Sequence, residues 1–384
     1  MSRLRVVADE NIPFAEEAFS TLGQVTLVPG REMTAETVRD CDVLCCRSVT
    51  RVGPDLLEGS RVRFVGTATI GIDHVDVDYL RGRGIAFASA PGSNANSVAE
   101  YVVAALLVLA RRHAFRLEGK TIGVVGAGNV GSRVARKAQG LGMRVLLNDP
   151  PLARQSGDPR FLPLDALFGA DVITLHVPLT RSGPDPTWHM ADAGFFERMR
   201  PDAFFINTSR GAVADTEAVK EALRGERLAG AVLDVWEDEP VIDLELLRLV
   251  EIGTPHIAGY SFDGKVCATE TIYRAACEAL NLEATWEPSA LMPPPQHPHL
   301  TLECSGRHDE DVVREAVLTI YDIEADDRAL RKSPADAEAR GAYFDHLRKT
   351  YHERREFHNT TLVLRDGSPG LARKLAGLGF KVAV

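Results

Sequence analysis

The sequence lacks the features that mark membrane, secreted and disordered proteins. Its longest apolar run, YVVAALLVLA, has ten residues and is too short to span a bilayer. The first ten residues, MSRLRVVADE, contain acidic groups and no long apolar core, so they do not form a secretory signal. With 45% hydrophobic and 26% charged residues, the composition is that of a globular chain. We therefore expect a cytoplasmic protein without a membrane partner.

An excess of positive charge is also missing. The chain has 44 Lys and Arg against 54 Asp and Glu, which gives a formal net charge of −10. No overall field would draw such a chain to nucleic acid or to anionic lipid, so we expect no nucleic-acid partner. An anionic substrate would need a local basic pocket.

Paired cysteine motifs are absent. None of the six cysteines belongs to a CxxC pair, and in CDVLCC they follow the pattern of a buried strand in which cysteine acts as a small hydrophobe. The sequence predicts reduced thiols and no metal site. The cysteines are Cys41, Cys45, Cys46, Cys267, Cys277 and Cys304.

Short runs rich in Val, Ile and Leu alternate with amphipathic segments along most of the 384 residues. This alternation is typical of parallel strands covered by helices, and the length suggests two or three domains. SVAE, residues 97–100, has the form of a capping box that would open a helix running to about His113. Five prolines between residues 287 and 299 indicate a linker, and a charged helix is expected from Asp336 to Phe357.

A glycine-rich motif, GAGNVG, lies between the apolar strand TIGVV and a helical pattern. In such a motif Gly126 allows a tight turn, Gly128 lets a pyrophosphate approach the backbone, and Gly131 packs the helix on the strand. Asp149 follows 18 residues after Gly131, where a carboxylate can accept the ribose hydroxyls and would repel a ribose phosphate. A tight turn without a ligand is the alternative. The motif predicts NAD binding by Gly126, Gly128, Asn129, Val130, Gly131 and Asp149.

Three further residues fit one reaction. Arg210 in NTSRGA, Glu239 in LDVWEDEP and His256 in TPHIAGY each have a simpler explanation alone: a surface ion pair, a solvated charge and a structural histidine. Together they could oxidise a 2-hydroxy acid. His256 would accept the hydroxyl proton, Glu239 would hold the imidazole in one tautomer, and Arg210 would bind the substrate carboxylate by two hydrogen bonds.

With GAGNVG, NTSRGA, LDVWEDEP and TPHIAGY in this order, the chain resembles the D-isomer-specific 2-hydroxyacid dehydrogenases. Stretches such as CRSVTRV, APGSNA, HIAGYSFDGK and YHERREF extend the resemblance, over nearly the whole chain, to one branch of that family. It implies NAD-dependent oxidation of 4-phospho-D-erythronate in pyridoxal 5′-phosphate biosynthesis, by a homodimer. Two alternatives stay open: a dehydrogenase for 3-phosphoglycerate or another 2-hydroxy acid, and an NAD-sensing protein similar to the corepressors of this fold.

The resemblance also implies further site residues. Substrate contacts would come from Ser48, Thr69 and Tyr260, although the two hydroxyls could equally cap turns. Cofactor contacts would come from Ser209, Arg210, Asp234 and Gly259. One of the tail cations could reach the substrate phosphate, or all could be solvated; they are Arg348, Lys349, Arg354 and Arg355. The sequence departs from the pattern of this branch of the family at two places, the residues TS before the arginine of the site loop and the isoleucine in TATIG. These differences would reshape the substrate pocket slightly.

The predicted fold class is α/β, with two Rossmann-like doubly wound parallel-sheet domains and a small α/β C-terminal domain. We expect a discontinuous substrate (lid) domain at residues 1–96 and 257–286, and an NAD-binding domain at 97–256. A Pro-rich linker at 287–299 and a dimerisation domain at 300–384 would follow.

Overall fold

The computed structural model describes residues 4–383, which form two compact units. Within these residues, one unit comprises 4–94 with Ser261–Pro294, and the other comprises Ala95–Tyr260 with 295–383. Each unit contains an open sheet of parallel strands covered by helices, so the predicted α/β class is confirmed. None of the helices within residues 4–383 is long and apolar enough to cross a membrane.

The first unit has a five-stranded sheet in the order β2-β1-β3-β4-β5. Its strands are β1 (Leu4–Asp9), β2 (Gly23–Val28), β3 (Val43–Cys46), β4 (Phe64–Thr67) and β5 (Ala86–Ala88). The short helices are α1 (Ala15–Phe19), α2 (Ala35–Val38), α3 (Pro54–Leu57) and α4 (Val77–Gly82), with 3-10 turns η1 (Gly30–Glu32) and η4 (Pro288–Ala290). Every residue of β3 is buried, and burial raises the pKa of Cys46 to about 12. All six cysteines are free thiols.

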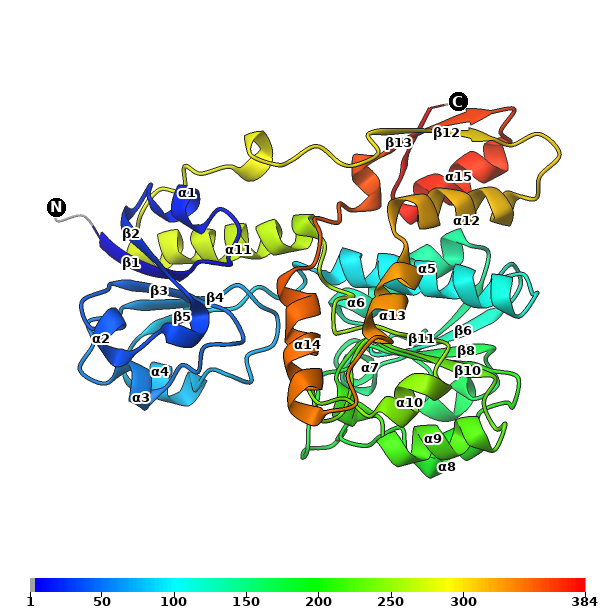
Figure 1. Ribbon diagram of the computed structural model, residues 1–384, viewed down its shortest axis with the longest axis horizontal. Coiled ribbons are helices and arrows are strands. Elements are labelled where there is room, and N and C mark those ends of the chain that lie inside the picture. Colours follow the sequence, from blue (N-terminus) through cyan, green and yellow to red (C-terminus); the bar gives the residue numbers. More distant parts are fainter. Residues whose placement is uncertain (1–3, 384) are drawn as a thin grey trace. The chain divides into compact units, whose positions relative to one another are not determined.

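A long helix from the later part of the chain completes this unit. Ser261 caps α11 (Phe262–Leu280) by accepting a hydrogen bond from the backbone N–H of Gly264 at 2.9 Å. Ile272, Tyr273 and other buried residues of α11 share a core with β1, β3 and β4. Figure 1 shows α11 in yellow-green beside the blue elements of the first sheet.

The second unit is built on a six-stranded sheet in the order β11-β10-β9-β8-β6-β7. Its strands are β6 (Thr121–Val125), β7 (Arg144–Asn148), β8 (Val172–Leu175), β9 (Phe204–Asn207), β10 (Gly230–Leu233) and β11 (Ile252–Gly253). The helices are α5 (Ala95–Arg112), α6 (Asn129–Gly140), α7 (Pro150–Ser156), α8 (Ala193–Arg198), α9 (Thr216–Arg224) and α10 (Leu244–Leu249), with η2 (Leu164–Leu167) and η3 (Gly211–Val213). Because β6 pairs with both β7 and β8, the chain reverses direction across the sheet at the carboxyl end of β6.

The capping-box interpretation of SVAE is wrong. Helix α5 begins at Ala95, so Ser97 lies inside it, and the Ser97 hydroxyl donates to the carbonyl oxygen of Ala258 at 2.8 Å. Glu100 is also buried and accepts a hydrogen bond from the backbone N–H of Phe357 at 3.0 Å. Both side chains are therefore committed to tertiary contacts, which the local spacing does not reveal.

The C-terminal segment, from Pro295 onward, packs against the six-stranded sheet domain and belongs to the same compact unit. Its three parallel strands are β12 (His299–Glu303), β13 (Thr361–Arg365) and β14 (Lys381–Ala383), and its helices are α12 (Asp309–Ile320), α13 (Ile323–Leu330), α14 (Ala337–Lys349) and α15 (Pro369–Leu378), with η5 (Phe357–Asn359). Buried residues of α12 and α15 form one hydrophobic cluster with those of α5 and α6. Figure 1 shows these helices close together.

The helix expected from Asp336 to Phe357 ends at Lys349. Beyond it Arg354 and Glu356 are both buried: Arg354 donates to the carbonyl of Ala258 at 2.9 Å, and Glu356 accepts from the amide of Asn96 at 2.6 Å. Alternate residues share one face in an extended chain but not in a helix. The extended backbone therefore brings both charged groups to the start of α5.

Candidate active site

The glycine-rich loop has the steric form of a phosphate-binding turn. Gly126 has φ +85°, and a Cβ atom there would lie 2.5 Å from the carbonyl oxygen of His176. A Cβ atom at Gly131 would lie 1.8 Å from the carbonyl oxygen of Gly126. At Gly128, which precedes the first turn of α6, no atom lies within 4 Å of a Cβ position. Two glycines are thus required by packing, and the third leaves space for a ligand at the amino end of the helix.

Asp149 links this loop to the end of β7. One carboxylate oxygen accepts the backbone N–H of Ala127 at 2.8 Å, and the other caps α7 by accepting the N–H of Leu152 at 3.0 Å. Each carboxylate oxygen has a second acceptor position, so the group can also accept hydroxyl donors. Asn129 and Gly128 are exposed at the amino end of α6. This arrangement fits the adenosine ribose and pyrophosphate of a dinucleotide.

Glu239 and His256 are in direct contact. Oε2 of Glu239 lies 2.7 Å from Nδ1 of His256, and Oε1 accepts the backbone N–H of Trp236 at 2.8 Å. Burial acts to raise the pKa of Glu239, but His256, the hydrogen bond from Trp236 and the charge of Arg348 together outweigh it and the pKa is lowered. Glu239 is therefore a carboxylate that can accept from Nδ1–H, and Nε2 is the ring nitrogen of His256 that does not face it.

A buried carboxylate fixes the backbone around His256, which has φ +57°. Asp234 accepts hydrogen bonds from the hydroxyl of Thr254 at 2.6 Å and from the backbone N–H groups of Ile257 at 2.8 Å and Ala258 at 3.0 Å. Burial raises the pKa of Asp234, against these hydrogen bonds. The residue that resemblance assigns to the cofactor thus braces the histidine loop in this structure.

Arg210 lies on the loop after β9, next to the turn that carries Glu239. A Cβ atom at Gly211 would lie 1.9 Å from the carbonyl oxygen of Trp236, so the two loops are in contact only because residue 211 is glycine. Nη1 of Arg210 donates to the carbonyl of Ser209 at 2.8 Å, and the Ser209 hydroxyl is 2.7 Å from Oδ1 of Asn207. The loops carrying the three predicted catalytic residues follow β9, β10 and β11, which are adjacent in the sheet.

Gly259 and Tyr260 follow the histidine. The ring of Tyr260 makes an edge-to-face contact with Tyr351, with ring centres 5.9 Å apart, and the guanidinium of Arg348 lies 5.7 Å from the centre of the Tyr260 ring. The sequence reasoning missed Tyr351, since no local pattern connects it to a residue about 90 positions earlier.

Ser48 and Thr69 belong to the other unit, where they follow the adjacent strands β3 and β4. Ser48 is exposed, and the Thr69 hydroxyl donates to the carbonyl of Gly71 at 3.0 Å. Next to Ser48, the side chain of Arg47 forms an ion pair of 2.9 Å with the fully buried Asp9, which the sequence reasoning missed. Both predicted residues therefore lie at the carboxyl edge of their sheet, where parallel sheets bind ligands.

His176, at the end of β8, was also missed. Its ring nitrogens lie 2.9 Å from the hydroxyl of Thr174 and 3.2 Å from that of Thr208. Burial lowers its pKa to about 3, so the ring is neutral and serves to position the neighbouring loops. Among residues 4–383, no three His, Cys, Asp or Glu side chains gather as they would around a metal ion.

Two family models match separate parts of the chain. Residues 100–258 match the NAD-binding domain of the D-isomer-specific 2-hydroxyacid dehydrogenases, and this region holds the glycine loop, Arg210, Glu239 and His256. Residues 291–379 match a domain of unknown function, DUF3410. The predicted cofactor, NAD, is confirmed by the first match.

Curated relatives cover nearly the whole chain. The erythronate-4-phosphate dehydrogenase of Salinibacter ruber is 50% identical over 374 residues, 94% of each chain, and that of Azotobacter vinelandii is 47% identical over 380 residues, 98% of this chain and 99% of its own. The structure also resembles D-lactate dehydrogenase from Aquifex aeolicus, solved with NAD and lactic acid, with a TM-score of 0.59 and 26% identity over 72% of this chain and 95% of that one. The predicted NAD-dependent dehydrogenase is thus confirmed, and the chain belongs to the erythronate-4-phosphate dehydrogenase family within the D-isomer-specific 2-hydroxyacid dehydrogenases.

Proposed function

We propose that this chain oxidises 4-phospho-D-erythronate to 2-oxo-3-hydroxy-4-phosphobutanoate with NAD, as a step in pyridoxal 5′-phosphate biosynthesis in the cytoplasm. One observation carries the proposal: the 2.7 Å contact between Glu239 and Nδ1 of His256, in a chain that is 42% to 50% identical to relatives of that name. NAD, when bound, would supply the acceptor for the hydride that leaves C2 of the substrate.

The protein side of this reaction is proton transfer and charge stabilisation. Nε2 of His256 accepts the proton of the C2 hydroxyl, and Glu239 stabilises the imidazolium that results. Arg210 holds the substrate carboxylate through its planar guanidinium and polarises the carbonyl that forms at C2. In the reverse direction the same imidazolium returns the proton.

The cofactor is proposed to lie on the glycine loop. Backbone N–H groups of residues 126–131 would hold the pyrophosphate at the start of α6, and Asp149 would accept the ribose hydroxyls. The open space at Gly128 supports this placement. Further along the chain, Ser209, Arg210, Asp234 and Gly259 would border the nicotinamide half, with Asp234 acting through the loop that it braces.

Three residues are the proposed substrate contacts by position in the sequence. They are Ser48 and Thr69, at the strand ends of the first unit, and Tyr260 of the second. The sequence-based boundaries, 1–96 with 257–286 for the substrate (lid) domain and 97–256 for the NAD-binding domain, assign Tyr260 to the lid domain, whereas the first compact unit resumes only at Ser261. A domain of this kind excludes water from the substrate, which favours hydride transfer over side reactions.

We also propose a homodimer formed through the C-terminal domain, residues 300–384. The exposed face of its three-stranded sheet supports this: Thr301, Val363 and Ala383 are exposed, whereas Leu302 and Leu362 are buried. Val363 is 37% exposed, which is large for an apolar strand residue. Light scattering of the purified protein should give twice the chain mass, and Val363→Asp should reduce it; a monomeric wild type would overturn the proposal.

Steady-state assays decide the substrate. We expect NAD-dependent turnover of 4-phospho-D-erythronate with a kcat/KM well above that for 3-phosphoglycerate. A preference for 3-phosphoglycerate would assign the chain to the alternative dehydrogenase. No turnover of either acid, together with tight NADH binding, would favour the dinucleotide-sensing alternative.

A further inference from the structure

Helix α14 of the C-terminal segment is packed on the turn that carries Glu239. A Cβ atom at Gly341 of this helix would lie 3.3 Å from a side-chain carbon of Val241 and 3.5 Å from one of Pro240. Phe344, one turn later, is fully buried and belongs to the same hydrophobic cluster as Trp236. The last turn of α14 is thereby held beside the proposed catalytic pair.

Arg348 lies in that last turn, with its guanidinium carbon 5.7 Å from the ring centre of Tyr260 and 5.9 Å from that of Phe344. Its Nε atom is buried without a hydrogen-bond partner among residues 4–383. Burial acts to lower the pKa of Arg348, but the interaction with Tyr260, which includes a hydrogen bond, and the negative charges of Glu239 and Asp345 outweigh it, so the pKa is raised. Arg348 therefore keeps a permanent positive charge and unused donor capacity next to the active-site loops.

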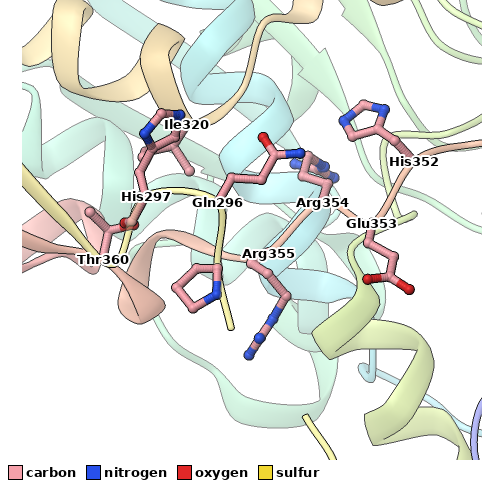
Figure 2. Close-up of a pocket in the computed structure, with 9 residues that line it drawn as sticks. Gln296, His297, Ile320, His352, Glu353, Arg354, Arg355 and Thr360 are labelled. Atoms are coloured by element: carbon pink, nitrogen blue, oxygen red, sulfur yellow. The ribbon is translucent and has the colours of Figure 1, made fainter. Parts of the chain in front are cut away.

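The other cations of the tail make different contacts, although Nε and Nη1 of Arg354 are also buried without a hydrogen-bond partner within residues 4–383. Nη2 of Arg354 binds the carbonyl of Ala258, and its guanidinium lies 4.0 Å from the ring centre of Tyr321. Nη2 of Arg355 donates to Oδ1 of Asn359 at 2.8 Å. Figure 2 shows Arg354 and Arg355 at a small pocket at the end of the proline-rich linker, lined by neither Glu239 nor His256. Lys349 is exposed.

We propose that Arg348 binds the phosphate group of the substrate, so that the domain of unknown function contributes directly to the active site of its own chain. This inference rests on the proposed function, which requires a phosphorylated 2-hydroxy acid. A guanidinium presents N–H donors in a plane that matches two phosphate oxygens. The substrate has two anionic ends: Arg210 takes the carboxylate and Arg348 the phosphate. In a chain of net charge −10, such a local cation is needed for a highly charged anion.

The proposal makes Arg348 a specificity residue. Charge-assisted hydrogen bonds of this kind contribute enough that Arg348→Gln should lower kcat/KM for 4-phospho-D-erythronate by about 10- to 100-fold, mainly through KM. The ratio of kcat/KM for the phosphorylated acid to that for D-erythronate should fall by a similar factor. Arg348→Lys should recover part of the loss. The matched control is Lys349→Gln, which removes a neighbouring exposed cation of the same helix and should leave both values unchanged.

An equal loss on the phosphorylated and unphosphorylated acids would overturn the proposal, because Arg348 would then act through Glu239 or through the fold. Calorimetric titration of the NADH-loaded protein with inorganic phosphate gives a second measurement that does not need turnover. Wild type and Lys349→Gln should bind phosphate saturably, and Arg348→Gln should not. Equal binding by Arg348→Gln, or no binding by wild type, would overturn the phosphate site. If wild type binds phosphate through Arg348 but oxidises neither acid, the proposed function fails and the anion site stands.

Discussion

At the scale of single residues, the proposed chemistry depends on the contact of 2.7 Å between Glu239 and Nδ1 of His256. In that proposal the carboxylate fixes the tautomer before the reaction and stabilises the imidazolium after it. Asp234 sets the backbone of the same loop through three hydrogen bonds to residues 254–258. Glu239 therefore orients the imidazole ring of His256, and Asp234 fixes the position of its backbone.

The first prediction concerns His256→Asn. Loss of the proton acceptor should reduce kcat by roughly 10²-fold or more, the usual scale for a general acid or base. NADH binding, followed by fluorescence titration, should stay close to that of wild type because the glycine loop is untouched. Turnover near the wild-type rate would return His256 to a structural role.

The second prediction concerns Arg210→Lys. The charge is kept, but an ammonium cannot form two parallel hydrogen bonds to a carboxylate. We expect kcat/KM to fall by about 10-fold or more, since charge-assisted hydrogen bonds of this type are strong. Arg227→Lys, at an exposed arginine that pairs with Glu197, serves as a control for charge-conserving exchange. An unchanged kcat/KM in Arg210→Lys would contradict bidentate recognition of the substrate.

At the scale of elements, the catalytic loops are held together by close backbone packing. The third prediction is that Gly211→Ala destabilises the protein by about 1 to 3 kcal/mol, the usual cost of overpacking, and lowers kcat. A Cβ atom there meets the Trp236 carbonyl at 1.9 Å and would push the Arg210 loop from the Glu239 turn. Gly169→Ala, where no atom lies within 4 Å, is the control. Equal thermal midpoints for the two variants would contradict the close contact.

Sequence reasoning succeeded where the signal is local. Local signals mark the ends of two helices: Asp215 caps the first turn of α9, and Gly379, at φ +107°, ends α15 after Leu378. It failed where tertiary contacts decide: Ser97 was expected to cap a helix and instead binds Ala258. The helix expected to reach Phe357 ends at Lys349, because the following charged residues are buried in an extended segment.

The same difference between local signals and tertiary contacts applies to the residues of the candidate site. The glycine loop, Arg210, Glu239 and His256 could be found because each sits in a short motif at the end of a strand. The contact of Arg348 with Tyr260 joins residues 88 positions apart, and no periodicity or motif encodes it. The four tail cations cannot be distinguished from the sequence, and only the packing of α14 on the Glu239 turn shows that Arg348 lies beside it.

At the scale of the whole molecule, the C-terminal segment and the NAD-binding domain share a buried charged cluster as well as a core. Glu100 of α5 accepts the backbone N–H of Phe357 and the amide of Asn96, and Lys137 of α6 lies 3.9 Å from it. Lys137 also donates to the carbonyl of Leu378 at 2.5 Å. The cluster therefore connects α5 and α6 with the C-terminal segment of the chain, and its charge state should affect global stability.

The last prediction concerns the pH dependence of that stability. Burial, together with repulsion from Glu356, raises the pKa of Glu100 from 4.5 to about 8, although Lys137 and Arg354 oppose the shift. Because the folded protein holds this proton more tightly than the unfolded chain, its contribution to stability is complete below about pH 4.5 and is lost as the pH rises to about 8. Glu100→Gln cannot lose a proton and keeps an acceptor for Phe357.

Denaturant unfolding of wild type and Glu100→Gln at pH 5 and pH 8.5 tests this directly, since titrating groups that do not interact with Glu100 cancel in the difference. Between the two pH values, wild type should lose about 1 to 3 kcal/mol of unfolding free energy relative to the variant, allowing for relaxation around the buried charge. Asp309→Asn, on the surface of α12, should show no such relative change. A constant difference between wild type and Glu100→Gln would mean that Glu100 stays ionised in the folded protein, paired with Lys137 and Arg354. The contact between the C-terminal segment and the NAD-binding domain would then be stabilised by ion pairs at both pH values, and not by a protonated Glu100 that ionises near pH 8.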